Sequence, residues 1–397
     1  MTELGTRRRP RDRKAQIAAT AGDLFRRQGY HGTAMSDIAT AVGITAPALY
    51  RHYPNKQAIL ADVVLSAVDG LVSTINAALD SATGPADQLR RLLDDLAALA
   101  VEQRDASALW QREGHHLEKA ERDERSRELT QAIRRWIAVL RRSRPELSGS
   151  DADLLCWSAL SVYGSISMHH VSPARIRLER LLPDLAGAAL RCDVVSPPVR
   201  VVVDHRGWPT HHVPTIRREQ LLASAVSLFR ERGFHSVSME DIGNTAGIAG
   251  PSVYRHFAGK AELLAAAMDR IAERLALSMR LSFELGLPPQ QTLEHLILSY
   301  VEITIQHRDG IAVYLSEGRN LPEPKATDLR RMQHGYFAEW SRLVVSCRDG
   351  WTERDARIAV HAAVSVVVDA VRTPRFSRRP RLAAELAGLA GTIVHGR

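Results

Sequence analysis

Three residue types that can contact phosphate occur twice in the chain at the same spacing. They are Tyr50, His52 and Lys56, which recur 204 positions later as Tyr254, His256 and Lys260. Phenol and imidazole groups form hydrogen bonds with phosphate oxygens, and an ammonium group neutralises phosphate charge. Each lysine stands in the first turn of a predicted helix, where the macrodipole disfavours a cation unless an anion shares the site. We therefore predict a phosphate contact at each lysine; the alternative is a solvated lysine without a partner.

A short helix is predicted immediately before each of these sets, and its outer face is a candidate surface for reading bases. Leu49 and Tyr53 lie one turn apart and are expected to face the core. The outward residues expected to read bases are Thr45, Ala46, Ala48 and Arg51 in the first copy, and Ala249, Gly250, Ser252 and Arg255 in the second. Most of these side chains are small, which suits contact with thymine methyl groups more than bidentate hydrogen bonding.

Two further positions complete the expected contact set around these helices. Thr33 is expected to bind phosphate, and the second copy loses that contact because Val237 takes its place. Ser238 is included with the second copy's DNA-contacting residues, and with Asp241 it also predicts a capping box. The first copy has Ala34 at that cap position, so its cap is expected to be weaker or to move to Thr33.

Positive charge is concentrated at the start of the chain. The whole chain carries a net charge of +8, and residues 7–60 alone carry +7 against +1 for residues 215–264. The N-terminal arm RRRPRDRK supplies much of this excess; its expected DNA-binding residues are Arg7, Arg8, Arg9 and Arg11. Such an arm, directly before a DNA-binding unit, is expected to bind phosphates. The alternative is a solvated tail.

Both copies follow a helical period, and the chain is expected to be all-α. Ile17, Ala21, Leu24 and Phe25 form an i, i+4, i+7, i+8 stripe, and Gly29 is expected to end that first helix. Two short helices joined by a turn at Gly43 then predict a helix-turn-helix unit, followed by a longer fourth helix that begins near Asn55 or Gly259. The helices expected beyond it span 86–104, 106–118, 125–143, 151–171 and 174–191, and in the second copy 289–307, 310–318, 325–347, 354–372 and 380–394.

The 204-residue offset divides the chain into two similar halves. The expected boundaries are a basic arm at 1–14, a first helix-turn-helix domain at 15–60 and a first helical domain at 61–192, then a linker at 193–214, a second helix-turn-helix domain at 215–264 and a second helical domain at 265–397. Four prolines interrupt the helical rhythm in the linker, where VRVVV can form one short strand.

Composition excludes several other classes of protein. Hydrophobic residues at 45% and charged residues at 25% are typical of a soluble globular protein, and the N-terminus lacks the apolar stretch of a signal peptide. Three scattered cysteines fit a reducing cytoplasm, where we expect the protein to act. The adjacent pairs His115-His116, His169-His170 and His211-His212 point to different helix faces, so no metal site is predicted. No catalytic or cofactor motif is found, so we expect neither an enzyme nor a cofactor.

The repeated motif resembles the TetR-type transcriptional regulators. The family pattern Gly-Val/Ile-Ser/Thr-x-x-x-Leu/Val-Tyr-x-His/Tyr-Phe/Tyr-x-x-Lys is matched from Gly43 to Lys56 and again from Gly247 to Lys260. The tandem arrangement is similar to that of the two-copy TetR-type repressors of mycobacteria and related actinobacteria, including those of lipid-uptake operons. The resemblance implies a double-stranded DNA operator, repression relieved by a small ligand, and no membrane partner.

In this family, the last two helices of each ligand domain form a four-helix dimer interface. The resemblance therefore implies a chain that closes on itself as a pseudo-dimer, with a homodimer of four heads as the rival arrangement. The aromatic residues expected to line an apolar or lipid-like ligand pocket are Trp110, Trp136, Trp157, Tyr163, Tyr300, Tyr314, Tyr336 and Trp340; the alternative for each is ordinary core packing. Two other classes remain open: an architectural DNA-binding protein without a ligand, and an enzyme or carrier with vestigial heads.

Overall fold

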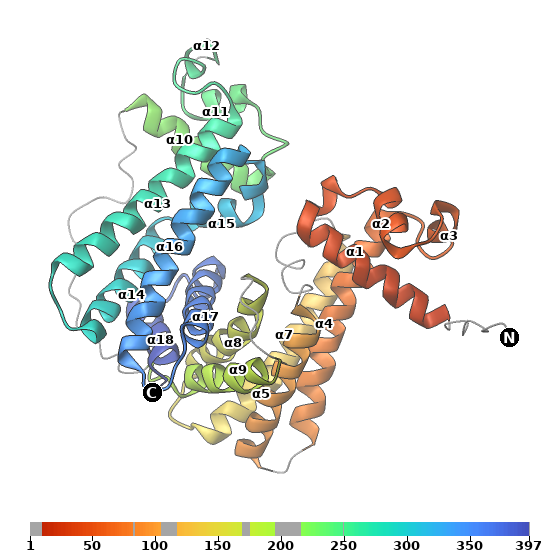
Figure 1. The fold of residues 1–397 in the computed structure, drawn as a ribbon, viewed down its shortest axis with the longest axis vertical. Helices are drawn as coiled ribbons and strands as arrows, with labels where there is room; N and C mark the ends of the chain where they lie inside the picture. Colours follow the sequence, from red (N-terminus) through yellow and green to blue (C-terminus); the bar gives the residue numbers. More distant parts are fainter. Residues whose placement is uncertain are drawn as a thin grey trace. The chain divides into compact units, whose positions relative to one another are not determined.

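The computed structural model describes residues 10–81, 84–104, 117–168, 175–194, 216–248 and 250–396. No strand occurs in these ranges, and the all-α expectation is confirmed (Figure 1). The helices of the first half are α1 (Pro10–Gly32), α2 (Met35–Val42), α3 (Ala46–Tyr50), α4 (Lys56–Asp80), α5 (Pro85–Glu102), α7 (Lys119–Ser143), α8 (Gly149–Gly164), the 3₁₀ turn η2 (Ser165–Met168) and α9 (Arg175–Arg191). The expected helix at 106–118 and the VRVVV segment lie mostly or wholly outside the described residues.

The α-helices of the second half follow a similar order. Its helices are α10 (Arg217–Arg232), α11 (Met239–Thr245), α12 (Gly250–Val253), α13 (Lys260–Glu284), α14 (Pro289–Gln306), α15 (Arg308–Glu317), the 3₁₀ turn η3 (Gly318–Asn320), α16 (Glu323–Cys347), α17 (Glu353–Arg372) and α18 (Leu382–His395). Chain contacts define two compact units, and the second takes in two pieces of the first half, residues 157–162 and 184–194.

The first three helices pack around one end of α4 (Figure 1). Phe25 and Leu49 are fully buried in this head core, where they meet Ile59 and Leu60 from the first turns of α4. The predicted inward stripe of α1 is confirmed, because Ile17 and Ala21 are also fully buried while Leu24 packs against the core from its edge. The apolar period of the sequence thus fixes which face of each helix is inside.

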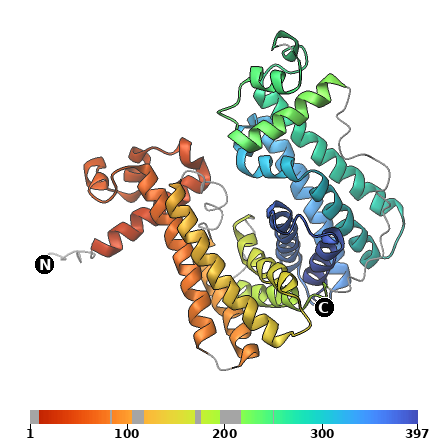
Figure 2. The same ribbon diagram turned by 180° about the vertical axis from the view of Figure 1, so that it is seen from behind.

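The second head is built by the same rule at the end of α13 (Figure 2). Phe229, Val253 and Phe257 are buried there. This core continues into the rest of the half, since Val313 of α15 and Leu329 of α16 belong to the same cluster. Because protein interiors are closely packed, a displacement of the helical domain is transmitted to a head that shares its core more directly than to a head joined by a flexible linker.

Helix ends follow local signals in the sequence. Gly29 and Gly233 have φ values of 80° and 77°, which favour glycine, and α1 is kinked at Gly29. Asn55 caps α4, with its Oδ1 accepting from the Ala58 N–H at 2.8 Å. Gly259 is the N-cap residue of α13, which begins at Lys260 and has no side-chain cap. The expected fourth-helix starts are therefore confirmed in both halves.

One boundary differs from the expectation. α1 begins at Pro10, so residues 10–14 of the expected arm are helical. Lys14 explains this extension, because its ammonium lies 3.6 Å from the Asp62 carboxylate and 5.1 Å from the centre of the Tyr53 ring. The second copy repeats the arrangement with Arg218, which stacks 4.7 Å over the Phe257 ring. Lys14 and Arg218 thus hold the first helix of each head against a buried aromatic residue of the same head.

One helix among the described residues is long and apolar enough to cross a membrane by length and composition alone. That helix is α4, which also supplies Ile59, Val64, Val68 and Ile75 to buried positions. It packs against α1, α5 and α7. These contacts account for its apolar residues as those of a core helix.

Candidate DNA interface

The recognition helix of the first head presents its outer face to solvent. Thr45 caps α3, with its Oγ1 accepting from the Ala48 N–H at 3.4 Å. Leu49 and Tyr53 are buried as expected, whereas Thr45, Ala46 and Arg51 are exposed and Ala48 and His52 are half-buried. The Tyr50 side chain is 53% exposed although it is a large aromatic. An exposed tyrosine beside small side chains is free to contact a partner surface.

The second head presents a similar face on a shorter helix. Tyr254 is 60% exposed, Arg255 and His256 are exposed, and Ser252 is half-buried. Gly250 opens α12, but Ala249 lies outside the described residues. The face therefore keeps its tyrosine, arginine and histidine, while its N-terminal part differs in residue type from that of the first head.

Both motif lysines bind backbone carbonyls within their own heads. Lys56 Nζ donates to the carbonyl oxygens of Tyr30 at 2.5 Å and Thr33 at 2.8 Å, and lies 4.4 Å from the Tyr30 ring centre. Lys260 Nζ donates to the Phe234 carbonyl at 2.8 Å and lies 4.6 Å from that ring centre. Sequence reasoning missed these acceptors because a backbone carbonyl carries no residue signal. The predicted phosphate contact stays a prediction.

The structure contradicts the role expected for Thr33. Its side chain is only 1% exposed, and its hydroxyl donates to the Gly29 carbonyl at 2.9 Å. A hydroxyl committed inside the α1–α2 turn is unavailable to phosphate. The cap of α2 is not moved to Thr33 either, because Ala34 holds the N-cap position and its N–H donates to Asp37 Oδ2 at 2.8 Å. Val237, the counterpart of Thr33, is also buried, so this position serves the core in both heads.

Ser238 is committed to a helix cap. Its Oγ accepts from the Asp241 N–H at 3.0 Å, and its own N–H donates to Asp241 Oδ2 at 2.8 Å. This reciprocal pair confirms the predicted capping box. The Ser238 hydroxyl also donates to Asp241 Oδ2 at 2.6 Å, and this bond together with the one from the Ser238 N–H lowers the pKa of Asp241. In the arm, Arg7, Arg8 and Arg9 lie outside the described residues, and Arg11 lies in the first turn of α1.

Most aromatic residues expected around a ligand pocket pack in the cores. Trp136 is fully buried in the first half, and Tyr163 is buried with its hydroxyl donating to the Leu93 carbonyl at 2.8 Å. In the second half, Tyr300, Tyr336 and Trp340 are buried with ring centres 5.6–6.3 Å apart. Trp157 and Tyr314 are half-buried, and Trp110 lies outside the described residues. Core packing therefore describes the buried members better than a pocket lining does.

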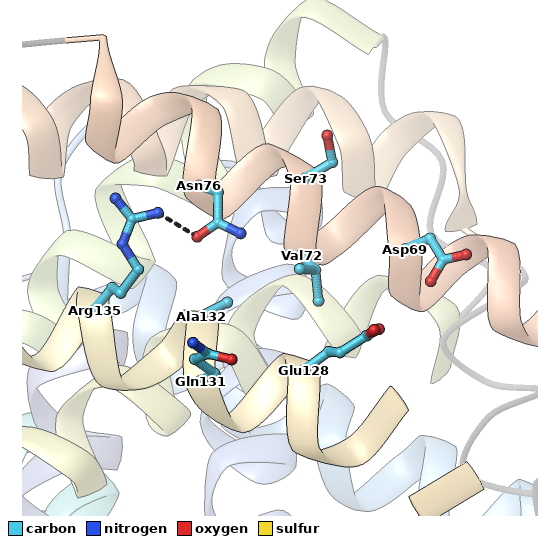
Figure 3. Close-up of a pocket in the computed structure, with 8 residues that line it drawn as sticks. All are labelled: Asp69, Val72, Ser73, Asn76, Glu128, Gln131, Ala132 and Arg135. Atoms are coloured by element: carbon cyan, nitrogen blue, oxygen red, sulfur yellow. Dashed lines mark hydrogen bonds between the residues drawn. The ribbon is translucent and has the colours of Figure 1, made fainter. Parts of the chain in front are cut away.

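A groove lies elsewhere, between α4 and α7 of the first half (Figure 3). Its volume is about 420 Å³, and its lining residues are Asp69, Val72, Ser73, Asn76, Glu128, Gln131, Ala132 and Arg135. Figure 3 places Asp69 and Arg135 at opposite ends. Arg135 donates to Asn76 Oδ1 at 2.6 Å and pairs with Asp80 at 2.5 Å, while Arg125 Nε lies 2.7 Å from Asp69. Two arginines of α7 thus contact α4 at both ends of a groove whose lining combines polar side chains with apolar surface.

The residues that line this groove are replaced by different types at the equivalent positions of the second half. The counterparts of Ser73, Glu128 and Ala132 are Leu277, Met332 and Tyr336. Tyr336 is buried, and Leu277 and Met332 are partly exposed apolar side chains. The two halves therefore present different chemistry between their equivalent helices. Sequence reasoning missed the groove because only the packing of helices some 60 residues apart reveals it.

Comparison with known proteins identifies the duplicated head. The model for bacterial regulatory proteins of the tetR family matches residues 17–63 and 221–267, and a tetracyclin repressor-like C-terminal domain matches residues 286–372. The transcriptional activator FasR of Mycolicibacterium smegmatis is 26% identical over 164 residues, which cover 41% of this chain and 74% of FasR. The transcriptional repressor KstR2 of Rhodococcus jostii is 31% identical over 105 residues, covering 26% of this chain and 52% of KstR2.

Solved structures of single regulators each align with about half of this chain. PfmR from Thermus thermophilus covers 47% of this chain and 97% of its own, with 26% identity and a TM-score of 0.40. KstR2 of Mycobacterium tuberculosis covers 46% of this chain and 95% of its own, with 22% identity and a TM-score of 0.41. The named relatives are transcription regulators and not enzymes. The chain therefore carries the N-terminal domain of the tetR family of bacterial regulatory proteins twice in tandem, with a tetracyclin repressor-like C-terminal domain in its second half.

Proposed function

We propose that the protein is a cytoplasmic, ligand-released repressor in which one chain supplies two non-identical DNA-reading heads. The observation that carries the proposal is the duplicated recognition face, in which Tyr50 and Tyr254 are each more than half exposed next to a buried core residue. The residues proposed to contact DNA are those named from the sequence, except Thr33 and Ser238. The Thr33 hydroxyl is bound inside its own head, and Ser238 caps a helix.

The proposed operator has two unlike half-sites. The recognition faces share their tyrosine, arginine and histidine but differ at the small residues, since Thr45 and Ala46 are replaced by Ala249 and Gly250. Phosphate-contacting residues set position, whereas groove-facing side chains set sequence. Footprinting on the protein's own upstream region tests this. Protection of a perfect palindrome would contradict it, and two unlike protected half-sites would support it.

A one-chain pseudo-dimer is supported by contacts inside the second compact unit. The Arg375 guanidinium lies 4.9 Å over the Trp157 ring, and the Thr392 hydroxyl lies 3.5 Å from Cys192 Sγ. Neither pair is repeated at the 204-residue offset, because His361 stands for Trp157 and Gly396 for Cys192. An interface between two copies of the first half would therefore lack both contacts, because Arg375 and Thr392 belong to the second half. The mass of the complex with a two-half-site duplex decides the point, since two chains per duplex would exclude the one-chain arrangement.

The groove between α4 and α7 is the proposed inducer site. Its volume falls within the usual range of about 300–1,000 Å³ for small-molecule sites. Its lining mixes apolar surface with hydrogen-bonding side chains such as Asn76, Gln131 and Glu128, which favours a ligand with hydrogen-bonding groups over the purely lipid-like ligand expected from the aromatic residues. A ligand there competes with the Arg125–Asp69 and Arg135–Asn76 contacts that hold α4, the helix on which the first head is built. A ligand must bind the DNA-incompetent state better, by roughly 1–3 kcal/mol, to release DNA.

A screen of polar and apolar small molecules against the protein–DNA complex tests this inducer proposal. Release of DNA by a polar compound, lost when Ala132 is replaced by the tyrosine of the second half, would support it. Release by apolar compounds only, or no release by any compound, would favour a lipid-responsive regulator or an architectural protein, respectively.

A further inference from the structure

The start of α1 extends beyond the apolar core of its head. α1 begins at Pro10, yet none of residues 13–16 is buried, and Ile17 is the next side chain that belongs to the head core. Three of residues 11–14 are basic and one is acidic, and cations near a helix N-terminus oppose the macrodipole. Helix ends fray unless other contacts hold them. The first turns of α1 therefore depend on polar contacts with the rest of the head.

A cluster of three residues supplies such contacts, and we call it the arm anchor: Lys14 of α1, Tyr53 between α3 and α4, and Asp62 of α4. The Tyr53 hydroxyl donates to the Asp62 carboxylate and lies 3.4 Å from the Lys14 carbonyl oxygen. The Lys14 ammonium lies 3.6 Å from Asp62 Oδ2. Burial and the hydrogen bond to Asp62 raise the pKa of Tyr53, so its hydroxyl stays protonated and remains a donor. The cluster thus ties the start of α1 to the turn that directly follows the recognition helix.

The second head lacks the carboxylate of this cluster, and its first helix starts later. Ala266 stands in place of Asp62, and Phe257 has no hydroxyl to donate. α10 begins at Arg217, which is the equivalent of Arg13, whereas α1 begins three residues earlier. The additional helix is therefore found in the head that has the complete cluster.

We infer that the arm anchor positions the basic arm on DNA, and that its three members are positioning residues. Residues 7–9 of the arm directly precede Pro10, so the chain keeps residue 7 within about 11 Å of it. A fixed start of α1 therefore limits how far these arginines can lie from the recognition helix. If the start of α1 frays, the arm must be ordered on binding, and this ordering costs affinity. The inference rests on the proposed function for its consequence at DNA, but the effect of the cluster on α1 is independent of DNA.

Asp62→Ala in the full chain tests the effect on α1, because alanine is the second head's own residue. Amide exchange of residues 14–18 should be about tenfold faster than in the wild type, with residues 218–222 unchanged. Tyr53→Phe also copies the second head; it keeps the ring and should accelerate the same amides to a smaller extent. Asp95→Ala is the matched control, because it removes a carboxylate of α5 that pairs with Arg91 on the helix surface, and it should leave these amides unchanged. Unchanged exchange in both cluster variants would overturn the inference.

A double-mutant cycle on operator DNA tests the consequence for the arm. Asp62→Ala should lower the affinity at least about fivefold in the wild-type chain, although loss of an acidic group near DNA would by itself raise it. In a chain whose residues 7–9 are all alanine, the same substitution should change the affinity less than about twofold, because no arm remains to be positioned. Asp95→Ala alters the net charge equally and should leave the affinity within about twofold of the wild type.

Two outcomes of this cycle separate the possible roles of the cluster. An equal loss of affinity with and without the arm arginines would overturn the inference, because the cluster would then support only the fold of the head. Should Asp62→Ala unfold, Tyr53→Phe provides the same cycle with a smaller expected loss. Failure of the wild type to bind DNA would contradict the proposed function, while the exchange of residues 14–18 would still decide whether the cluster holds α1.

Discussion

Replacing Arg7, Arg8 and Arg9 together by alanine should lower the affinity for DNA and should make that affinity depend less steeply on salt concentration. The start of α1 at Pro10 determines which arginines can be replaced without affecting a helix. α1 begins at Pro10, and Lys14 is tied to Asp62 and Tyr53, so truncation through residue 13 would also remove helix. Substitution before Pro10 changes charge without shortening α1.

The expected magnitude follows from counterion release. Three lost phosphate contacts should lower the slope of log K against log salt by about 2.7, at about 0.9 for each contact. A fourfold rise in salt, from about 50 to 200 mM, should therefore shrink the affinity gap between wild type and variant about 40-fold. Fluorescence anisotropy with a labelled operator across a salt series measures both quantities.

A matched control removes the same charge elsewhere. Arg90, Arg330 and Arg342 are exposed side chains in the helical domains, and their joint replacement by alanine also lowers the net charge by three. This control should leave the slope within about 0.5 of the wild type. If the two triple variants give the same slope, the arm acts only through net charge, and the reasoning about local phosphate contacts is wrong.

Three further changes test the groove and the stability of the second half. Ala132→Tyr, which copies Tyr336, should abolish DNA release by any polar inducer while preserving operator affinity in its absence; retained release would exclude the groove. Glu385→Ala should lower the free energy of unfolding by about 3–5 kcal/mol in a urea titration, because Arg379 Nε and Glu385 Oε2 lie 2.6 Å apart and both side chains are nearly buried. Burial, reinforced by Arg357 and His334, lowers the pKa of His361 to about 4, so the fold favours the neutral ring. Stability should therefore be full above about pH 6.5 and fall by up to about 3 kcal/mol toward pH 4, and His361→Gln should flatten that loss.

The sequence predicted elements whose signals are local. The buried stripe of α1, the burial of Leu49 and Tyr53, and the start of α4 after Asn55 all follow from residue types within one or two helical turns. The expected helix at 354–372 likewise corresponds to α17, where Thr352 forms a capping box with Asp355. Caps and periodicity are short-range physics, so a single sequence is enough to read them.

The errors arose where a side chain has more than one available partner. Thr33 stands just before a helix and has the type of a cap or phosphate ligand, but its hydroxyl binds the Gly29 carbonyl four residues back. For Lys56 the phosphate contact stays a prediction, and its residue type did not reveal the carbonyls it binds 23 and 26 residues away. Backbone acceptors are present at every position, so residue type alone does not identify which one is used.

The groove depends on pairs of residues that no local pattern relates. Arg135 meets Asn76 and Asp80 only because α4 and α7 pack side by side. Ala132 lines the groove at the position where the other half has the much larger Tyr336. The aromatic residues expected to line a ligand pocket prove to be mostly buried. The two halves differ instead in the side chains that line their equivalent helix pairs.

The two heads also place their helix caps differently, which bears on unequal DNA reading. The first head caps its recognition helix through Thr45 and its fourth helix through Asn55, whereas the second head caps the helix before recognition through Ser238. A side-chain cap stabilises a helix end by about 1 kcal/mol. The first recognition helix is thus held in place before DNA arrives, while the four-residue α12 relies on Val253 and Phe257 packing beneath it. Since ordering a segment on binding costs affinity, the first head, which also follows the basic arm, should contribute the larger share of operator affinity.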